Sequence, residues 1–301
     1  MLNKILLVIA LGLFSGLTLA DAQPAASAAA RVKGQIIAAR VQGHVVAVSK
    51  TDNSTRTLHD GDKVTDQTTV VTSPGASVIL VFSNGATVNV AADSNLDIEQ
   101  FEQDPLAEDV KMSDLKQETG TSTTRLNLTK GERVGKVVHL NVDRGSEFTV
   151  QTPVGAAGIR GTIFRIIFRP GRDGKAFFVI TTSDGTVVFR GSTSGPIPVP
   201  AGKQVVATFN YTAPSAGGTD TTPPTATATV VTTDTSPAEE SQITNVVQQF
   251  TGTATTVVFP PSGSANGSGT GSGTGTPPAP NNTPSDPAAP LPATTSGAGT
   301  G

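Results

Sequence analysis

The chain has 301 residues, of which 36% are hydrophobic and only 4% aromatic, and its formal net charge at pH 7 is -3. Its 32 glycines and 21 prolines indicate that much of this length cannot contribute to a hydrophobic core. Cysteine is absent, which excludes structural disulfides, thiolate metal sites and a lipid-modified cysteine. So small a charge gives no electrostatic argument for nucleic-acid binding.

The first 22 residues have the pattern of a signal peptide. Lys4 precedes an apolar run over residues 5–19, and small residues follow it at the spacing that signal peptidase prefers. A run of this length is short for a membrane span, which needs about 20 residues. We therefore expect cleavage after Ala22, an N-terminal lead-in over residues 23–40, and a periplasmic or secreted bacterial protein with no stable membrane span.

Short β-rich runs separated by turn residues occupy residues 41–212. Two pairs of runs are typical of hairpins, since Asn84-Gly85 and Asp184-Gly185 supply the positive φ that a tight turn requires. The strands expected in chain order are 43–48, 69–71, 78–82, 86–90, 96–98, 137–142, 148–151, 162–169, 177–182, 186–190 and 205–209. Sustained helical periodicity with caps is lacking here, although the polar residues 108–118 could form one weak helix. The pattern predicts an all-β fold, a single domain of short strands and hairpins arranged as a β-sandwich or as a β-roll of the solenoid type.

Residues 152–168, which read TPVGAAGIRGTIFRIIF, set three glycines before an apolar run. They do not match a phosphate-binding pattern, and no helical pattern follows them. The run alternates, with Phe164, Ile166 and Phe168 on one side and with isoleucines and arginines on the other. Such a strand is partly covered on both faces. Gly158 and Gly161 are therefore expected where the backbone turns sharply or passes close to a neighbouring strand.

Residues 213–301 contain no basic residue and are rich in Thr, Gly, Pro, Ser and Ala. Such a composition buries too little apolar surface to offset chain entropy, so we expect a mostly disordered low-complexity tail. The best candidate for order is the segment 241–260, which holds most of the large apolar residues of the tail and could add a late strand or a short helix.

The runs and turns of residues 41–210 together resemble the FecR domain. The most specific part of the resemblance is the segment from Thr-Pro to Arg-Gly-Thr-x-Phe. Its residues are Thr152, Pro153, Gly155, Gly158, Arg160, Gly161, Thr162 and Phe164, and they are expected to serve structure or partner contact. For Arg160 both roles stay open, because its side chain could bond loop carbonyls or present its charge to a partner.

The resemblance implies a regulatory role. FecR-type regulators relay the loading state of an outer-membrane transporter across the inner membrane, and a cytoplasmic N-terminal segment of theirs controls a sigma factor. Here the leader begins almost at the first residue, so we expect the extracytoplasmic FecR domain alone, without the cytoplasmic sigma-controlling segment.

Candidate catalytic residues are few. His44 and His139 lie in strand-like runs, and the sequence His59-Asp60-Gly61-Asp62, which could suggest a metal or an acid/base pair, is first of all typical of a turn. We therefore expect no enzyme, and no catalytic, cofactor-binding or metal-binding residue. Two functions remain open. One is a signalling or interaction module that binds an envelope protein by edge-strand pairing or by its charged faces. The other is a structural or carbohydrate-binding envelope protein with a cell-wall glycan as ligand, although a single Tyr and no Trp are available to stack on sugar rings.

Overall fold

The structure is a computed structural model that describes residues 30–191, 195–211, 230–254 and 256–263. The expected signal peptide and much of the expected tail lie outside these residues. Within the described part, no helix is both long enough and apolar enough to cross a membrane.

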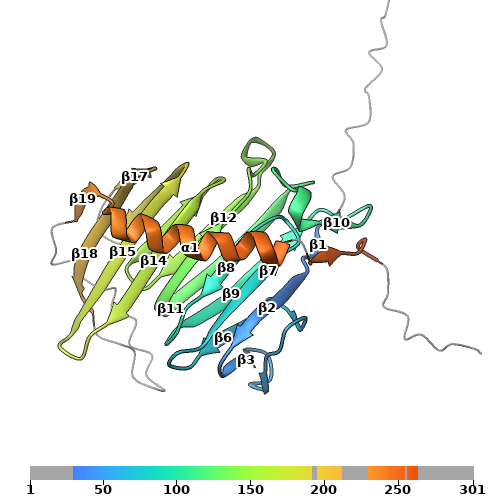
Figure 1. Ribbon diagram of the computed structural model, residues 1–301, viewed down its shortest axis with the longest axis horizontal. Helices are drawn as coiled ribbons and strands as arrows, with labels where there is room; N and C mark the ends of the chain where they lie inside the picture. The colour runs from blue at the N-terminus through green and yellow to red at the C-terminus, as the bar shows by residue number, and fades with distance from the viewer. Residues whose placement is uncertain (1–29, 192–194, 212–229, 255, 264–301) are drawn as a thin grey trace, which may run out of the picture. The chain divides into compact units, whose positions relative to one another are not determined.

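Nearly all regular elements of the described part are strands, as expected from the sequence (Figure 1). In chain order they are β1 (Val32–Lys33), β2 (Ile36–Gln42), β3 (Val45–Ser49), β4 (Thr55–Thr57), β5 (Lys63–Val64), β6 (Thr68–Thr72), β7 (Ser77–Phe82), β8 (Thr87–Val90), β9 (Asn95–Gln103), β10 (Val110–Lys111), β11 (Ser122–Lys136), β12 (Glu147–Thr152), β13 (Gly155–Ile159), β14 (Ile163–Pro170), β15 (Lys175–Asp184), β16 (Thr186–Gly191), β17 (Pro196–Pro200), β18 (Lys203–Asn210), β19 (Val231–Asp234) and β20 (Val258–Phe259). Two short 3-10 turns, η1 (Met112–Asp114) and η2 (Val142–Arg144), and one α-helix, α1 (Pro237–Ala254), complete the list.

Most strands belong to two facing sheets that share β11. Sheet A runs in the order β4, β3, β6, β9, β11, β12, β13, β16, β17, with β1 beside β6 on β9. Sheet B runs in the order β5, β2, β7, β8, β11, β14, β15, β18, β19. Neighbours are antiparallel except β11 and β12, and β11 is the strand that belongs to both sheets. Successive pairs of strands along the chain belong to alternate sheets, so both sheets are extended together from one end of the molecule to the other.

β11 changes sheets along its length of 15 residues. Its residues up to Lys130 pair with β9 and β12, and those from Gly131 pair with β8 and β14. Gly131 has a φ of 107°, and a Cβ there would overlap Ser94, so only glycine fits at the crossing. A register shift between Leu128 and Lys130 precedes it. This bulge shifts the inward and outward alternation of the β11 side chains by one residue. Residues after the bulge that would otherwise point outward therefore point into the core.

The interior between the sheets holds the main hydrophobic core. Its largest fully buried side chains are phenylalanines, which come from both sheets. The rings of Phe178 and Phe189, one from each sheet, stack with centroids 4.7 Å apart. Side chains that alternate inward along the strands therefore fill one shared core.

Three sequence expectations are wrong in detail. The Asp184-Gly185 turn does not close a hairpin, because β15 pairs within sheet B and β16 within sheet A. Residues 137–142 do not form a strand; they make only an isolated bridge between Gln117 and His139. Their apolar pattern arises because Val137 and Leu140 enter the core from an irregular segment. Residues 108–118 form β10 and η1 and no α-helix. The structure also adds β1 and β2 before residue 41, and both pair with strands of the main sheets.

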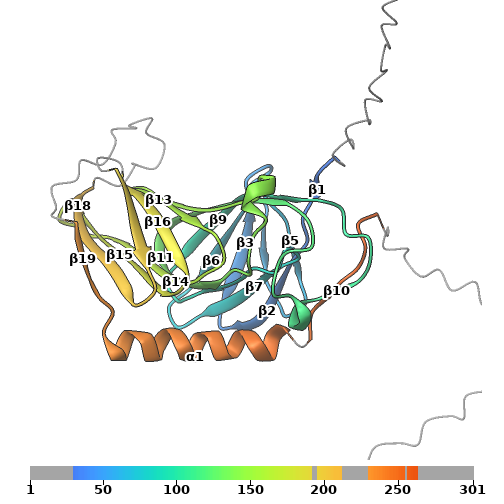
Figure 2. The same cartoon turned by 90° about the horizontal axis from the view of Figure 1, so that it is seen from above.

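Helix α1 lies along the outer side of sheet B (Figure 2). It begins with a capping box, in which the Glu239 amide donates a hydrogen bond to the Ser236 hydroxyl (3.3 Å) and the Ser236 amide donates one to the Glu239 carboxylate (3.1 Å). Ile243 and Phe250 of α1 are buried in a second apolar cluster with residues of sheet B. β20 follows and pairs only with β10. Most of α1 and all of β20 fall in the segment 241–260.

The last strand of sheet A has an unusual edge. β17 reads PIPVP and pairs with β16 alone, through Pro196, Pro198 and Pro200 opposite Arg190, Val188 and Thr186. Proline has no backbone N–H, so the hydrogen-bonded pairs with β16 must come from Ile197 and Val199. The prolines then line the outer edge, which offers no N–H donor.

Candidate interaction site

The motif residues lie on one continuous path from sheet A to sheet B. Thr152 ends β12, Gly155 and Gly158 belong to β13, and Phe164 lies in β14. The turn over residues 160–162 joins β13, which pairs within sheet A, to β14, which pairs within sheet B. The motif is therefore a hairpin followed by a crossing between the two sheets.

The hairpin end of the motif is fixed by close contacts. The Thr152 hydroxyl donates a hydrogen bond to the Gly155 carbonyl (2.9 Å) across the turn that contains Pro153. A Cβ on Gly155 would lie 2.5 Å from the Arg190 carbonyl oxygen and 2.8 Å from the ring of Phe189. Glycine is required there because the neighbouring strand and a core ring leave no room for a side chain.

The crossing turn is equally tight at Gly161. This residue has a φ of 101°, and a Cβ would lie 3.0 Å from the Cα of His139. The next crossing turn lies against it, since a Cβ on Gly185 would be 2.6 Å from the Gly161 carbonyl oxygen. Gly161 thus combines a left-handed backbone with a close approach, and both expectations for it are confirmed.

Gly158 differs from Gly161, and the expectation of a sharp turn or close backbone there is wrong. Its φ is not positive, and the nearest atom to a Cβ would be the Val188 carbonyl oxygen at 3.8 Å, an ordinary contact. The reason is its position in the middle of β13. A side chain at residue 158 would point away from the core, out of sheet A.

Thr162 and Phe164 are buried. Phe164 is fully enclosed in the main core, and its ring covers Gly135, the residue opposite it on β11. Ile166 and Phe168 enter the same core. On the other face of β14, Ile163 packs against the cluster beneath α1, so the strand is covered on both faces as its sequence predicted.

Arg160 is the motif residue that packing does not explain. Its side chain is exposed and makes no hydrogen bond or ion pair with the residues that the structure describes. By strand alternation it lies on the outward side of β13 with Ala156 and Gly158. Arg190 is opposite Ala156 on β16, and it too is exposed and without an ion pair in the described part. Two unpaired guanidinium groups therefore flank a stretch of very small residues.

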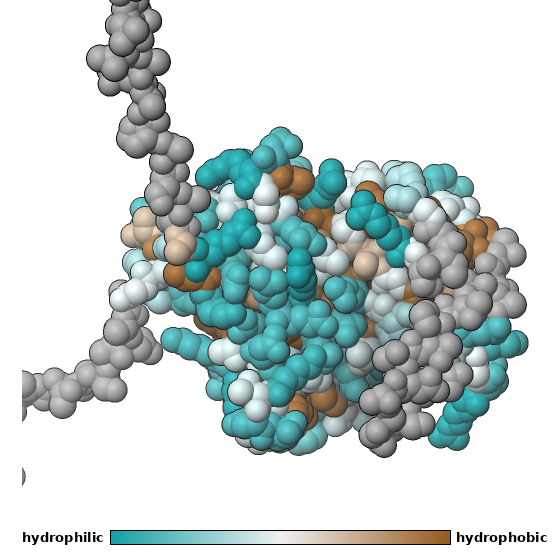
Figure 3. Space-filling view, turned by 180° about the vertical axis from the view of Figure 1, so that it is seen from behind, coloured by the Kyte–Doolittle hydropathy of each residue, from teal (hydrophilic) through white to brown (hydrophobic). Residues whose placement is uncertain are grey.

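The outer face of sheet A is polar. Figure 3 views the side of the molecule away from α1, and hydrophilic residues predominate where described atoms are visible. Across the sheet, Asp97, Asn127, Gln151, Ala156 and Arg190 form one continuous row of neighbours. Acidic groups on this face are paired, Asp97 with Lys50 (2.8 Å) and Glu147 with Arg125 (3.5 Å).

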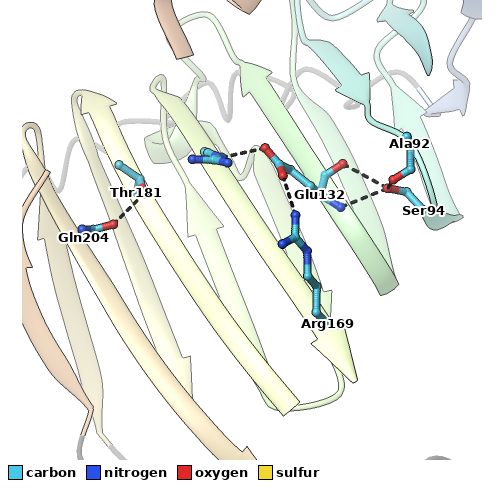
Figure 4. Close-up of polar contacts among 7 residues, drawn as sticks. Ala92, Ser94, Glu132, Arg169, Thr181 and Gln204 are labelled. Carbon is cyan, nitrogen blue, oxygen red and sulfur yellow. Dashed lines mark hydrogen bonds and ion pairs between the residues drawn. The ribbon is translucent and has the colours of Figure 1, made fainter. Parts of the chain in front are cut away.

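The outer face of sheet B carries a charged network near the crossing of β11 (Figure 4). Glu132 accepts hydrogen bonds from Arg165 (2.7 Å) and Arg169 (3.2 Å), which lie on β14. The Glu132 amide donates to the Ser94 hydroxyl (3.0 Å), which donates to the Ala92 carbonyl (3.1 Å). These bonds tie three segments together where β11 joins sheet B, so their role is structural.

The first turn of α1 adds carboxylates to this face. Glu240 accepts a hydrogen bond from Ser183 (2.8 Å), and Glu239 accepts one from Gln204 (3.3 Å), which also lies near Thr181 in Figure 4. The bond from Ser236 is the main cause that lowers the pKa of Glu239, and the nearby charge of Arg165 acts in the same direction. The helix therefore binds its N-terminal end to sheet B through ionised and polar groups.

Arg133 is a buried cation that the sequence did not reveal. It is 0% exposed, faces the interior between Val90 and Ile166, and none of its three side-chain nitrogens has a hydrogen-bond partner. Burial lowers the pKa of Arg133 to about 9, with partial compensation from the charge of Asp97. Simple alternation from Leu126 and Leu128 would place residue 133 outside. The bulge before Gly131 turns it inward.

Among the residues that the structure describes, no group of three potential metal ligands comes together. His59 lies 3.7 Å from Asp62 at a turn in which Gly61 has a φ of 88°. A cavity of about 390 Å³ lies between the end of α1 and β2. Its Asp60 carboxylate is engaged by the Val41 amide (2.6 Å), and no acid/base pair converges there.

The fold and the motif define an all-β module, and comparison with known proteins gives its family. Residues 68–188 match the model of the FecR protein family, as the motif predicted. The match supports a signalling or regulatory module. No curated protein matches the chain.

Two crystal structures show distant similarity, and each is described as that of a putative anti-sigma factor from Parabacteroides distasonis ATCC 8503. Both are 13% identical, with TM-scores of 0.39 and 0.37. The alignments cover 60% and 55% of this chain, and the chain spans 64% and 59% of the length of those proteins.

Proposed function

We propose that the protein is an exported, non-enzymatic FecR-domain module that binds a protein partner in the bacterial cell envelope. The family match supports the regulatory part of this proposal. The leader pattern of residues 1–22 supports export, and the absence of cysteine fits an envelope protein that folds without disulfides.

The observation that carries the proposal is the state of Arg160. Gly155, Gly161 and Phe164 are explained by backbone geometry, close contact or core burial. Arg160 has no such explanation, since it is exposed and unpaired within the described part. An arginine that stabilises nothing in its own fold is available to a partner, and its planar guanidinium can bind a carboxylate through two parallel hydrogen bonds.

The surroundings of Arg160 specify the contact further. Arg190 lies on the same outward face, opposite Ala156 on the neighbouring strand, and Ala156 is four residues, or about 13 Å along the strand, from Arg160. Gly158 and Ala156 between them allow a partner backbone to approach closely. The partner surface therefore carries carboxylates that match the two arginines.

A matched pair of variants tests this proposal. Arg160→Ala is compared with Arg172→Ala, which removes an equally exposed arginine from the turn between β14 and β15. A photo-crosslinking residue at position 188, beside Gly158, captures whatever binds this face in living cells. We expect Arg160→Ala to abolish the crosslinked product without changing the melting temperature, and Arg172→Ala to retain it. A product that survives Arg160→Ala would exclude this contact site.

Export has its own test. N-terminal sequencing of the protein from the extracytoplasmic fraction should give Gln23 as the first residue. Recovery of the chain with Met1 intact from that fraction would contradict the cleavage.

The second class of function, carbohydrate or cell-wall binding, is not favoured. Sugar sites stack aromatic rings against the ligand, and Phe177, at 40% exposure, is the one exposed aromatic residue among those that the structure describes. Tight binding of the purified protein to isolated cell wall, unchanged by Arg160→Ala, would reverse this preference.

A further inference from the structure

The outer face of sheet B contains an apolar surface built from several strands. Ile79 and Val81 of β7 and Val134 of β11 are buried in one cluster, and Ile163 of β14 and Ile37 of β2 pack against it. The cluster also holds Ile243 and Phe250 of α1, and its remaining buried members come from the segments of β10, η1 and β20: Leu106, Val110, Met112, Val257 and Phe259. Release of α1 alone would remove Ile243 and Phe250 from this cluster and uncover the patch of the sheet B surface that they contact.

Polar groups border this patch at the N-terminal end of α1. Ser183 and Gln204 bond the carboxylates of Glu240 and Glu239, and Arg165 lies close enough to lower the pKa of Glu239. An apolar centre with a polar, charged rim is the usual composition of an interface between separate proteins. The face beneath α1 therefore has the character of a binding surface for a helix with an acidic first turn.

Few side chains of α1 are buried against this face. Among its described side chains only Ile243, Phe250 and Thr253 are buried, and one carboxylate oxygen of Glu240 is buried without a hydrogen-bond partner. Its sequence includes Thr, Asn, Val and Gly, which are modest or poor helix formers, so the free helix would not persist in water. Local detachment is therefore much easier than unfolding of the sheets.

The position of α1 in the chain makes such detachment simple. In the described part, no strand of sheet A or sheet B follows α1, and β20 after it pairs only with β10. Release of the helix thus breaks no hydrogen bond within either sheet. The two sheets and their shared core can stay intact while the outer face of sheet B opens.

We propose that the outer face of sheet B is a helix-binding surface that α1 occupies at rest, and that an amphipathic helix of a partner protein can replace α1. The chemistry of that helix follows from α1: two carboxylates in the first turn, then apolar side chains at the spacing of Ile243, Val247 and Phe250. This surface lies on the side of the molecule opposite to Arg160, so the inference does not depend on the proposed function.

Hydrogen exchange on the unmodified full-length protein tests the first half of this proposal. Amides of α1 should exchange at least tenfold faster than those at the centre of β11, β14 and β15, because they open without the sheets. Equal protection of α1 and these strands would mean that the helix leaves only when the whole body unfolds, and the proposal would be overturned.

A peptide in trans tests the second half. The probe is a fluorescein-labelled peptide with the sequence of residues 236–254, and it is titrated into the full chain and into Ile243→Asp/Phe250→Asp, which weakens the resident helix. We expect at least tenfold tighter binding to that variant. The exposed Gln248→Asp serves as the matched control and should behave as the unmodified chain. A peptide carrying Glu239→Lys and Glu240→Lys should bind neither.

A reversible crosslink between α1 and sheet B tests the same exchange without the Ile243→Asp/Phe250→Asp variant, so the outcome does not depend on the stability of that variant. Because the chain has no cysteine, Ser183→Cys/Glu240→Cys introduces one pair of thiols, which a short methanethiosulfonate crosslinker joins and dithiothreitol releases. The crosslinked protein should exclude the peptide, and the reduced protein should bind it. Equal binding in both states, or no binding to the reduced protein while its sheets remain folded by circular dichroism, would refute the exchange.

Discussion

The two sheets share one core, yet their outer faces differ. Sheet B presents isoleucines and valines beneath α1, whereas sheet A presents Asn127, Gln151, Gly158 and paired or free charges to the outside. The difference is visible within the motif itself. β13 in sheet A carries Ala156 and Gly158 outward, and β14 in sheet B carries Ile163 outward. The outward residues of a strand thus indicate whether a further layer covers it, and the uncovered face is where contact with another molecule requires no rearrangement.

The largest expected effect comes from the interior that serves both sheets. Phe164→Ala should lower the free energy of unfolding by about 3 to 5 kcal/mol, because it leaves a cavity where a fully buried ring covers Gly135. Phe177→Ala, at an exposed ring on the outer face of sheet B, serves as the control and should cost less than about 1 kcal/mol. Urea denaturation measures both. Similar losses for the two variants would show that the core is not where stability resides.

The second effect has the opposite sign. Arg133→Met should stabilise the protein by about 1 to 4 kcal/mol, since it replaces an unpaired buried cation by an apolar side chain. Burial lowers the pKa of Arg133 to about 9 in the folded protein, whereas in the unfolded chain its pKa keeps its ordinary, higher value. The native protein therefore gains stability as pH rises above about 9.

The advantage of Arg133→Met should accordingly be smaller at pH 10 than at pH 7. Chemical denaturation of both proteins at the two pH values measures it. An advantage that grows with pH would mean that the pKa of Arg133 is not depressed.

The third effect separates two glycines of one motif. Gly161→Val should cost about 1 to 3 kcal/mol, because it places a β-branched side chain at a φ of 101° and against His139. Gly158→Val adds a side chain to the open face of sheet A and should stay within about 0.5 kcal/mol of the unmodified protein. Thermal unfolding of the pair gives the comparison directly. If Gly158→Val proves as damaging as Gly161→Val, the face of sheet A is covered after all.

The smallest effect on stability belongs to Arg160. Arg160→Ala should change the free energy of unfolding by less than about 0.5 kcal/mol, since the side chain is exposed and unpaired in the described part. Calorimetry of the purified variant measures this. A clear drop in melting temperature would give Arg160 a structural role and remove it from the contact site.

The sequence was sufficient to predict what depends on neighbours in the chain. The turn signal Asn84-Gly85 marked a real hairpin between β7 and β8. The signal Asp184-Gly185 marked a real turn, but it joins β15 of sheet B to β16 of sheet A and closes no hairpin. Alternation along residues 163–168 correctly distinguished the side chains that enter the main core from those on the outer face of sheet B. The sequence predicted helix α1 only in part. The sequence Ser236-Pro237-Ala238-Glu239 has the capping-box pattern that indicates the start of a helix. The low-complexity composition of the surrounding tail nevertheless favoured a prediction of disorder.

What depends on distant pairing could not be predicted. β11 is not among the expected strands, because its role follows from β8 and β14 on one side and from β9 and β12 on the other. The inward direction of Arg133 follows from a bulge that no local residue pattern announces. Locating the candidate contact site required both the sequence and the structure. The motif identified Arg160, and only the structure showed that Gly155, Gly161 and Phe164 are fixed by close packing whereas Arg160 is exposed.

The prolines of β17 prevent a further strand from adding to sheet A at this edge. Hairpins that alternate between two sheets form an arrangement that could be extended indefinitely, by more of the same chain or by another molecule, as in fibrous assemblies. Strand addition needs donors, and Pro196, Pro198 and Pro200 leave the free edge of sheet A with carbonyl oxygens alone. At high local concentration, this end of the protein resists polymerisation, and copies stay separate even when they meet edge to edge.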